Sequence, residues 1–261
     1  MGKVKTLTLP LIITRGMIVF PGNQKLVEAG RKFSINAVNQ ARADSLVFLT
    51  AQKNAAIENP KEEDIYTVGT LCRILSITER ENAVKVRIEV VERVRLENTH
   101  FDESANCYLT TGHTLDNPEN NDPEVENAYL DAITSTLDSL PSVVANMPKA
   151  LINQISKSDD LIAVLYSLAA FVDASASQKQ ELLEINDTPT LFTAVMNLIK
   201  GEETKSKIES DINEAVRKQT DKSQKEYYLR EKLKAIKKEL GENVDDTSSP
   251  DAVLEKLEKE P

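Results

Sequence analysis

The chain has 261 residues, which exceeds the usual size of a single core, so we expect two folded parts and an extension. Apolar residues make up 40% and Trp is absent, which is typical of globular cores packed with aliphatic side chains. A net charge of −10 makes nucleic acid an unfavourable partner, and no apolar run approaches the ~18 residues that cross a bilayer. We therefore expect a cytoplasmic protein with no membrane partner.

Residues 1–115 form short strand-like runs separated by turn residues. One run has an apolar face that alternates with charged residues, and its apolar members are Val84, Val86, Ile88 and Val90. This period of two predicts a strand with that face packed inward. Residues 34–41 instead have helical spacing, so a barrel-like β domain with one helix is predicted.

Residues 116–124 contain two prolines and several Asn, which favour a linker over helix or strand. The apolar period then becomes helical, and residues 125–201 are predicted to form a helical bundle that ends at Gly201. Its centre is the run from Leu161 to Val172, which is apolar on nearly every side.

Residues 202–241 are predicted to form a long helical arm, because no Pro interrupts them and apolar residues return with spacings of four and three. The row of residues at this spacing is polar at Gln219, Lys222 and Glu226, so the middle of the arm is expected to stay solvated. Residues 242–261 read as an acidic loop and the start of a truncated helix. The predicted fold class is α+β: an N-terminal barrel-like β domain with one helix, then a helical bundle and a long coiled-coil-like helix.

The motifs of common catalytic sites are missing. None of the eight glycines belongs to a phosphate-binding loop with Lys and Ser or Thr, and no Ser lies in a nucleophile motif. The two histidines, His100 and His113, have no Cys or carboxylate at metal-ligand spacing. We therefore predict no catalytic residue, no cofactor site and no metal site in this chain.

Several motifs resemble the Lon substrate-binding domain, in the order in which that family has them. They are Leu9-Pro10-Leu11, Val19-Phe20-Pro21-Gly22, Gly30-Arg31, Val68-Gly69-Thr70 and Glu92-Arg93-Val94-Arg95. The run from Lys222 to Glu242 resembles the helix that precedes the ATPase module in complete bacterial Lon proteases, and freestanding Lon-domain proteins lack it. The resemblance covers almost the whole chain.

This resemblance implies a non-catalytic N-terminal receptor region that recognises unfolded or damaged proteins and supports the assembly of a homohexamer. It implies that the parent protein is an ATP-dependent serine endopeptidase, an AAA+ ATPase with a Ser-Lys dyad, which uses ATP and Mg. The alternatives are a freestanding Lon-domain binding module and a coiled-coil adaptor without protease activity.

Substrate binding is expected on apolar surface of the β domain and on the arm. The candidate residues are Phe20, Pro21, Leu26, Tyr227, Tyr228 and Leu229. Tyr227 and Tyr228 are adjacent, so a single helix face cannot bury both, and at least one is expected to be exposed.

Overall fold

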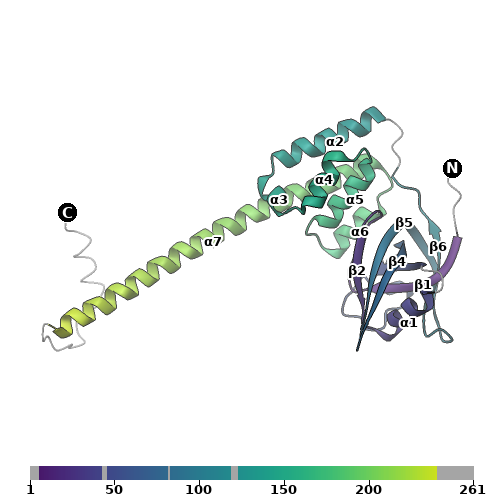
Figure 1. Ribbon diagram of the computed structural model, residues 1–261, viewed down its shortest axis with the longest axis horizontal. Coiled ribbons are helices and arrows are strands. Elements are labelled where there is room, and N and C mark those ends of the chain that lie inside the picture. The colour runs from purple at the N-terminus through teal and green to yellow at the C-terminus, as the bar shows by residue number, and fades with distance from the viewer. Residues whose placement is uncertain (1–5, 43–45, 82, 119–122, 240–261) are drawn as a thin grey trace. The chain divides into compact units, whose positions relative to one another are not determined.

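The computed structural model describes residues 6–42, 46–81, 83–118 and 123–239 (Figure 1). Six strands come first: β1 (Thr6–Thr14), β2 (Gln24–Ala29), β3 (Leu46–Ala51), β4 (Val68–Arg80), β5 (Ala83–Asp102) and β6 (Cys107–Thr114). Helix α1 (Lys32–Ala41) lies between β2 and β3 in the chain, and a 3-10 turn, η1 (Glu62–Asp64), precedes β4. The predicted α+β class is therefore confirmed, with the β part first.

The strands form a ring that is closed along only part of its length. The sheet order is β2-β5-β4-β3-β1-β6, and a further pairing between β5 and β6 closes the ring. β5 is long enough to pair with β2 through Val84–Glu89 and with β6 through Val94–Asp102. β6 reaches only Leu11 of β1, so the end of β1 pairs with β3 alone among the described strands. The ring therefore stays open between the end of β1 and the free edge of β2.

The apolar face predicted for the β5 strand is confirmed. Val84, Val86, Ile88 and Val90 are buried, whereas Arg87 between them is exposed. They pack with residues of α1 and of β1 to β4 in one aliphatic core. The alternation that the sequence shows is therefore the alternation between core and solvent.

Five helices follow and pack into a bundle: α2 (Pro123–Asp138), α3 (Pro141–Asn146), α4 (Lys149–Lys157), α5 (Leu161–Phe171) and α6 (Ala176–Glu184). Two of them have polar caps, because Asp160 accepts a bond from the amide of Ala163 and Ser175 accepts one from that of Gln178. The bundle shares its core with the sheet, since Ile18, Phe20 and Val68 pack in the same cluster as α5 and the start of α7. β strands and bundle thus belong to one compact unit, which ends at Ser206.

Helix α7 (Thr188–Glu239) is continuous through Gly201, where the sequence analysis ended the bundle helix (Figure 1). Glycine lowers helix stability by only about 1 kcal/mol, and no Pro follows it, so packing of Leu191, Val195 and Ile199 carries the helix onward. From Lys207 onward α7 belongs to a second compact unit, in which every described side chain up to Lys232 is exposed. The predicted acidic loop at 242–261 lies outside the described residues.

Candidate functional site

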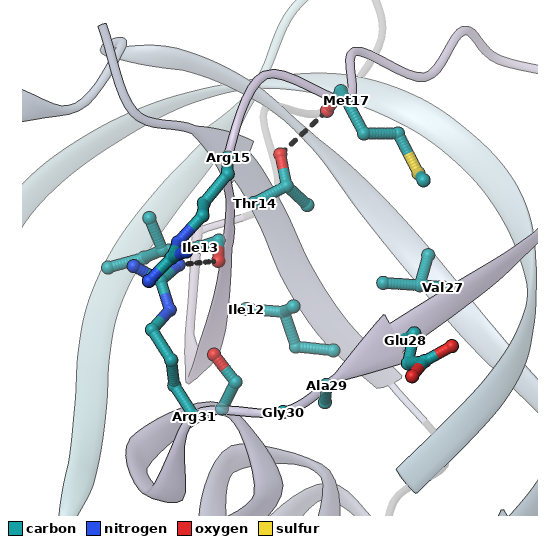
Figure 2. A pocket seen from close by; sticks show the side chains of 11 residues that line it. Ile12, Ile13, Thr14, Arg15, Met17, Val27, Glu28, Ala29, Gly30 and Arg31 are labelled. Carbon is teal, nitrogen blue, oxygen red and sulfur yellow. Dashed lines mark hydrogen bonds between the residues drawn. The ribbon is translucent and has the colours of Figure 1, made fainter. Parts of the chain in front are cut away.

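A cavity lies where the strand ring is open. It has a volume of about 610 Å³ and is lined by the end of β1, the end of β2 and the start of α1 (Figure 2). We call it the seam cavity. Its lining includes Ile12, Arg15, Met17, Val27, Glu28, Ala29, Arg31 and Ser34. A hollow bordered by two strand edges can accept an extended chain more readily than a flat surface can.

One wall of the seam cavity is apolar. Ile12, Val27 and Ala29 are almost fully buried and pack together in the aliphatic core of the ring. Met17, at the turn after β1, also lines the cavity and is 41% exposed. This turn is held by a hydrogen bond of 2.8 Å that the Thr14 hydroxyl donates to the Met17 carbonyl. Met17 is therefore the apolar surface of this wall that an entering side chain would contact first, and its flexible side chain can adapt its shape to that contact.

The opposite side of the cavity is cationic. The Arg31 guanidinium donates hydrogen bonds to the Ile13 carbonyl and, at 2.8 Å, to Gln52 Oε1, and it lies 4.6 Å above the Phe33 ring. These partners are neutral, so they orient the charge without neutralising it. Burial and then the nearby charge of Arg15 lower the pKa of Arg31, and in Figure 2 the two guanidinium groups lie side by side. Among the described residues, no carboxylate forms an ion pair with either arginine.

Ser34 adds an unused polar atom to the same lining. Its side chain is 3% exposed and its Oγ has no hydrogen-bond partner among the described residues. It lies in the first turn of α1, where unpaired backbone amides give a helix a positive end. That turn carries no acidic residue, and the N-cap Arg31 makes no capping bond, so the positive end is uncompensated.

Glu28 is the carboxylate of the lining, and its charge is partly balanced by Lys85 on β5, 3.6 Å away. Its side chain points away from both arginines in Figure 2. The seam cavity therefore has an apolar wall and a separate cationic side, a combination suited to a ligand that carries both kinds of group.

Two of the predicted site residues are buried and not on the surface. Phe20 is fully buried and its ring stacks on Tyr166 of α5, with centroids 5.7 Å apart. Pro21 beside it is also buried. The turn that contains them is fixed by Asn23, whose side-chain amide donates to both of their carbonyls. Phe20 packs the strand ring against the bundle, and neither Phe20 nor Pro21 offers side-chain surface to a ligand.

The other predicted residues are exposed. Leu26 is 56% exposed on β2, next to Val27 of the seam cavity. Tyr227 and Tyr228 are 68% and 64% exposed on α7, and Leu229 is exposed beside them. Leu26 belongs to the first compact unit and the α7 residues to the second.

Arg15, Arg31 and Ser34 are site residues that the sequence patterns did not predict. Arg31 has a signal in the sequence, because Gly30-Arg31 directly precedes the predicted helix. Arg15 follows Leu9-Pro10-Leu11 in the motif that resembles the family, but nothing local in the sequence indicates that α1 packs against β1 and so brings Arg15 beside Arg31.

The described residues offer little else for chemistry. They contain no group of three or more His, Cys, Asp or Glu side chains that could hold a metal ion. Both cysteines are buried, and burial raises the pKa of Cys72 to about 12, which keeps it a protonated and unreactive thiol. No described helix combines the length and apolarity that crossing a membrane requires.

Known proteins resemble this chain over nearly its whole length. Lon protease of Clostridioides difficile is 34% identical over 256 residues, which are 96% of this chain and 32% of that protein. Lon protease of Aquifex aeolicus is 32% identical over 89% of the chain and 30% of its own length. The chain thus spans about a third of the length of these relatives.

A solved structure supports the fold. The N-terminal domain of Mycobacterium avium complex Lon protease matches 74% of this chain with a TM-score of 0.59, at 15% sequence identity, and 98% of that structure is covered. The family model for the ATP-dependent protease La (LON) substrate-binding domain matches residues 8–201. The chain therefore belongs to the LON substrate-binding domain family and corresponds to the N-terminal region of a Lon protease.

Proposed function

We propose that the chain is the non-catalytic receptor region of an ATP-dependent Lon serine protease and recognises unfolded or damaged proteins for degradation. The observation that supports this most is the open strand ring, where the seam cavity borders the free edge of β2 and the exposed Leu26. Catalysis would belong to the part of the protein that this chain does not span, an AAA+ ATPase that uses ATP and Mg together with a Ser-Lys protease.

Recognition of unfolded proteins follows from what such chains expose. A folded protein buries its backbone hydrogen-bonding groups and most of its large apolar side chains. An unfolded segment presents both, and it can pair with a free strand edge while its side chains enter a neighbouring hollow. Contacts of this kind tolerate many sequences, because the backbone supplies much of the binding.

The test compares an unfolded with a folded form of one protein. Reduced, carboxymethylated α-lactalbumin is expected to bind the chain, whereas calcium-bound native α-lactalbumin is not, as measured by fluorescence anisotropy. Leu26→Ser and Met17→Ser should each weaken binding several-fold, since each removes exposed apolar area beside the seam cavity. Val125→Ser is the matched control, because Val125 is 41% exposed on the bundle helix α2. Equal binding of both forms would refute the receptor function.

We further propose that α7 supports self-association, in the parent as a homohexamer. Ile208, Ile212 and Val216 follow one another at intervals of four residues and are each more than half exposed. Such a row lies along one side of a helix and can pack against a second copy. Sedimentation velocity should show less self-association for Ile208→Lys and Ile212→Lys, but not for the control Asn213→Lys on a neighbouring face.

A cytoplasmic location and the absence of membrane and nucleic-acid partners remain part of this proposal. The acidic balance of the chain supports them, because a charge of −10 repels anionic lipid and polyphosphates. Tyr227, Tyr228 and Leu229 are proposed as a second, weak apolar contact on α7, which their exposure supports.

A further inference from the structure

We infer that the seam cavity selects extended segments in which a side-chain carboxylate, from Asp or Glu, lies next to apolar residues. The segment would pair with the free edge of β2 and place apolar side chains against Met17, in front of the buried Ile12 and Val27. Its carboxylate would lie between Arg15, Arg31 and Ser34. This inference rests on the proposed receptor function and adds a chemical class of substrate to it.

The backbone of the segment has a place to pair. β2 forms its ladder with β5 along one edge, and no other described strand pairs with it. The end of β1 is likewise free of β6 after Leu11. Both edges border the seam cavity, so a bound strand would extend the ring at the place where the chain leaves it open (Figure 2).

The charge of the cavity determines which segment fits. Two guanidinium groups lie side by side at one end, and the described carboxylates form no ion pair with them. Arg31 already uses neutral acceptors to hold its position, so its orientation is fixed before a ligand arrives. A carboxylate bound there would relieve the repulsion between the two cations, whereas a lysine in the same place would increase it.

Ser34 supports an anion independently of the arginines. A buried hydroxyl without a hydrogen-bond partner is unfavourable, and native structures usually satisfy such atoms. Its place in the first turn of α1 adds backbone amides that also favour an anion. A carboxylate oxygen would accept a hydrogen bond from the Ser34 hydroxyl, which would give this buried atom the partner it lacks.

The probes are three labelled peptides of sequence acetyl-Lys-Val-Thr-Val-X-Val-Thr-Lys-amide, in which X is Asp, Asn or Lys. Both ends are blocked, so the side chain of X supplies the carboxylate. We expect the Asp peptide to bind the chain about tenfold more tightly than the Asn peptide, and the Lys peptide to bind most weakly, in anisotropy titrations at low salt. Equal affinity for Asp and Asn would overturn the inference.

Variants of the chain test the assigned residues. Arg15→Gln should reduce the preference for Asp over Asn to less than about threefold, because one of the two cations is lost. Arg95→Gln is the matched control: Arg95 is exposed on β5 outside the seam cavity and should leave all three affinities unchanged. An undiminished preference in Arg15→Gln would remove the cationic side from the site.

Ser34→Ala separates a binding role from a structural one. Removing a buried hydroxyl without a partner should leave the melting temperature unchanged or raise it, whereas affinity for the Asp peptide should fall several-fold. Unchanged affinity would exclude Ser34 from the site. Backbone pairing is tested with two Asp peptides that are N-methylated at alternate residues in opposite phase. One should lose binding and the other keep it, and equal binding of both would exclude pairing with the β2 edge.

Two further outcomes distinguish this inference from the function on which it rests. If the chain binds unfolded α-lactalbumin but does not distinguish Asp from Asn, the receptor function stands and the carboxylate site is refuted. A fourth probe, the Asn peptide with a free C-terminal carboxylate in place of the amide, gives the second outcome. If it binds as tightly as the blocked Asp peptide, the site recognises chain ends and the internal-segment assignment is wrong.

Discussion

Arg93 is the largest side chain that the structure buries completely. Its guanidinium donates at 2.9 Å to the Leu183 carbonyl, at 2.7 Å to that of Ile185, and also to that of Asp116. Leu183 and Ile185 belong to the end of the bundle helix α6 and the residues after it, so one side chain of the strand ring satisfies three carbonyls at its junction with the bundle. Burial lowers the pKa of Arg93, because it removes the guanidinium from water, and the three carbonyls accept hydrogen bonds that partly replace this lost hydration.

Arg93→Ala is expected to destabilise the fold by about 3 kcal/mol, since it leaves the buried Leu183 carbonyl and two partly buried carbonyls without this donor and empties a fully buried site. Urea unfolding followed by circular dichroism measures this loss. Arg95→Ala, two residues along the same strand and exposed, should change stability by less than about 0.5 kcal/mol. A similar loss of unfolding free energy in both variants would show that the hydrogen bonds from Arg93 to the carbonyls do not stabilise the fold.

Cys72 gives a prediction about alkaline pH. Burial raises its pKa to about 12, whereas the thiol of an unfolded chain ionises near pH 8.5. Between these values the unfolded state loses a proton that the folded state keeps, so folding stability falls as pH rises through that window. The stability of the wild type relative to Cys72→Ala should therefore fall by up to about 1.4 kcal/mol per pH unit above pH 9. A difference that does not change with pH, in urea titrations from pH 7 to 10.5, would contradict the burial of this thiol.

At the scale of single residues, the sequence predicts some positions and cannot predict others. Alternation correctly identified Val86 as inward-facing, because the period of a strand is a local property. Arg93 lies six residues after the exposed Arg87, and the period of two places both on the same face of the strand, yet Arg93 is buried. Its burial depends on the bundle that packs over that face, and no local pattern contains this information.

Gly201 shows how far a single element could be predicted. Glycine commonly ends helices, and for that reason the sequence predicts the end of the bundle helix there. In the structure Gly201 lies within α7, because the apolar residues before it pack in the bundle core and the residues after it have adequate helix propensity.

Gly201→Ala is therefore expected to stabilise the chain by about 0.5 to 1 kcal/mol. A methyl group at this position would meet no atom within 4 Å, and alanine loses less backbone entropy than glycine when it becomes helical. A rise in the melting temperature with unchanged circular dichroism would agree with this. The control is Gly112→Ala, which should destabilise, because its methyl group would lie 2.3 Å from the Phe48 ring. Stabilisation at Gly112, or destabilisation at Gly201, would contradict the assigned surroundings.

The strand order explains why the seam cavity could not be predicted. The sequence indicated the strands and the helix after Gly30-Arg31, which are local features. It contained no signal that β6 pairs with β1 only as far as Leu11 and leaves the rest of that edge open. The proximity of Arg15 and Arg31 depends on α1 packing against β1, which is a long-range contact.

At the scale of the whole molecule, the linker and the core lead to opposite expectations about whether the β part folds without the helical bundle. The Pro- and Asn-rich stretch at 116–124 predicts that the β part folds alone. The structure packs Phe20 and Ile18 in the same cluster as Tyr166 and Leu191 of the helices, and Arg93 bonds across the same junction. Without the bundle, this face of the ring would expose large apolar side chains and an unsatisfied arginine.

The last prediction is that residues 1–206 unfold in one cooperative step, because a shared core couples the ring to the bundle. Cys72 and Cys107 are buried in the ring, so their reaction with a thiol reagent reports opening of the β part. Circular dichroism at 222 nm reports chiefly the helices. We expect the two signals to change at the same urea concentration, and Arg93→Ala to lower both midpoints together. Loss of helical signal while the thiols stay protected would show that the β part folds alone, as the linker predicts.

A fragment of residues 1–118 makes the same distinction. We expect it to bind a hydrophobic dye and to leave its thiols reactive, because the bundle no longer covers Phe20 and Val68.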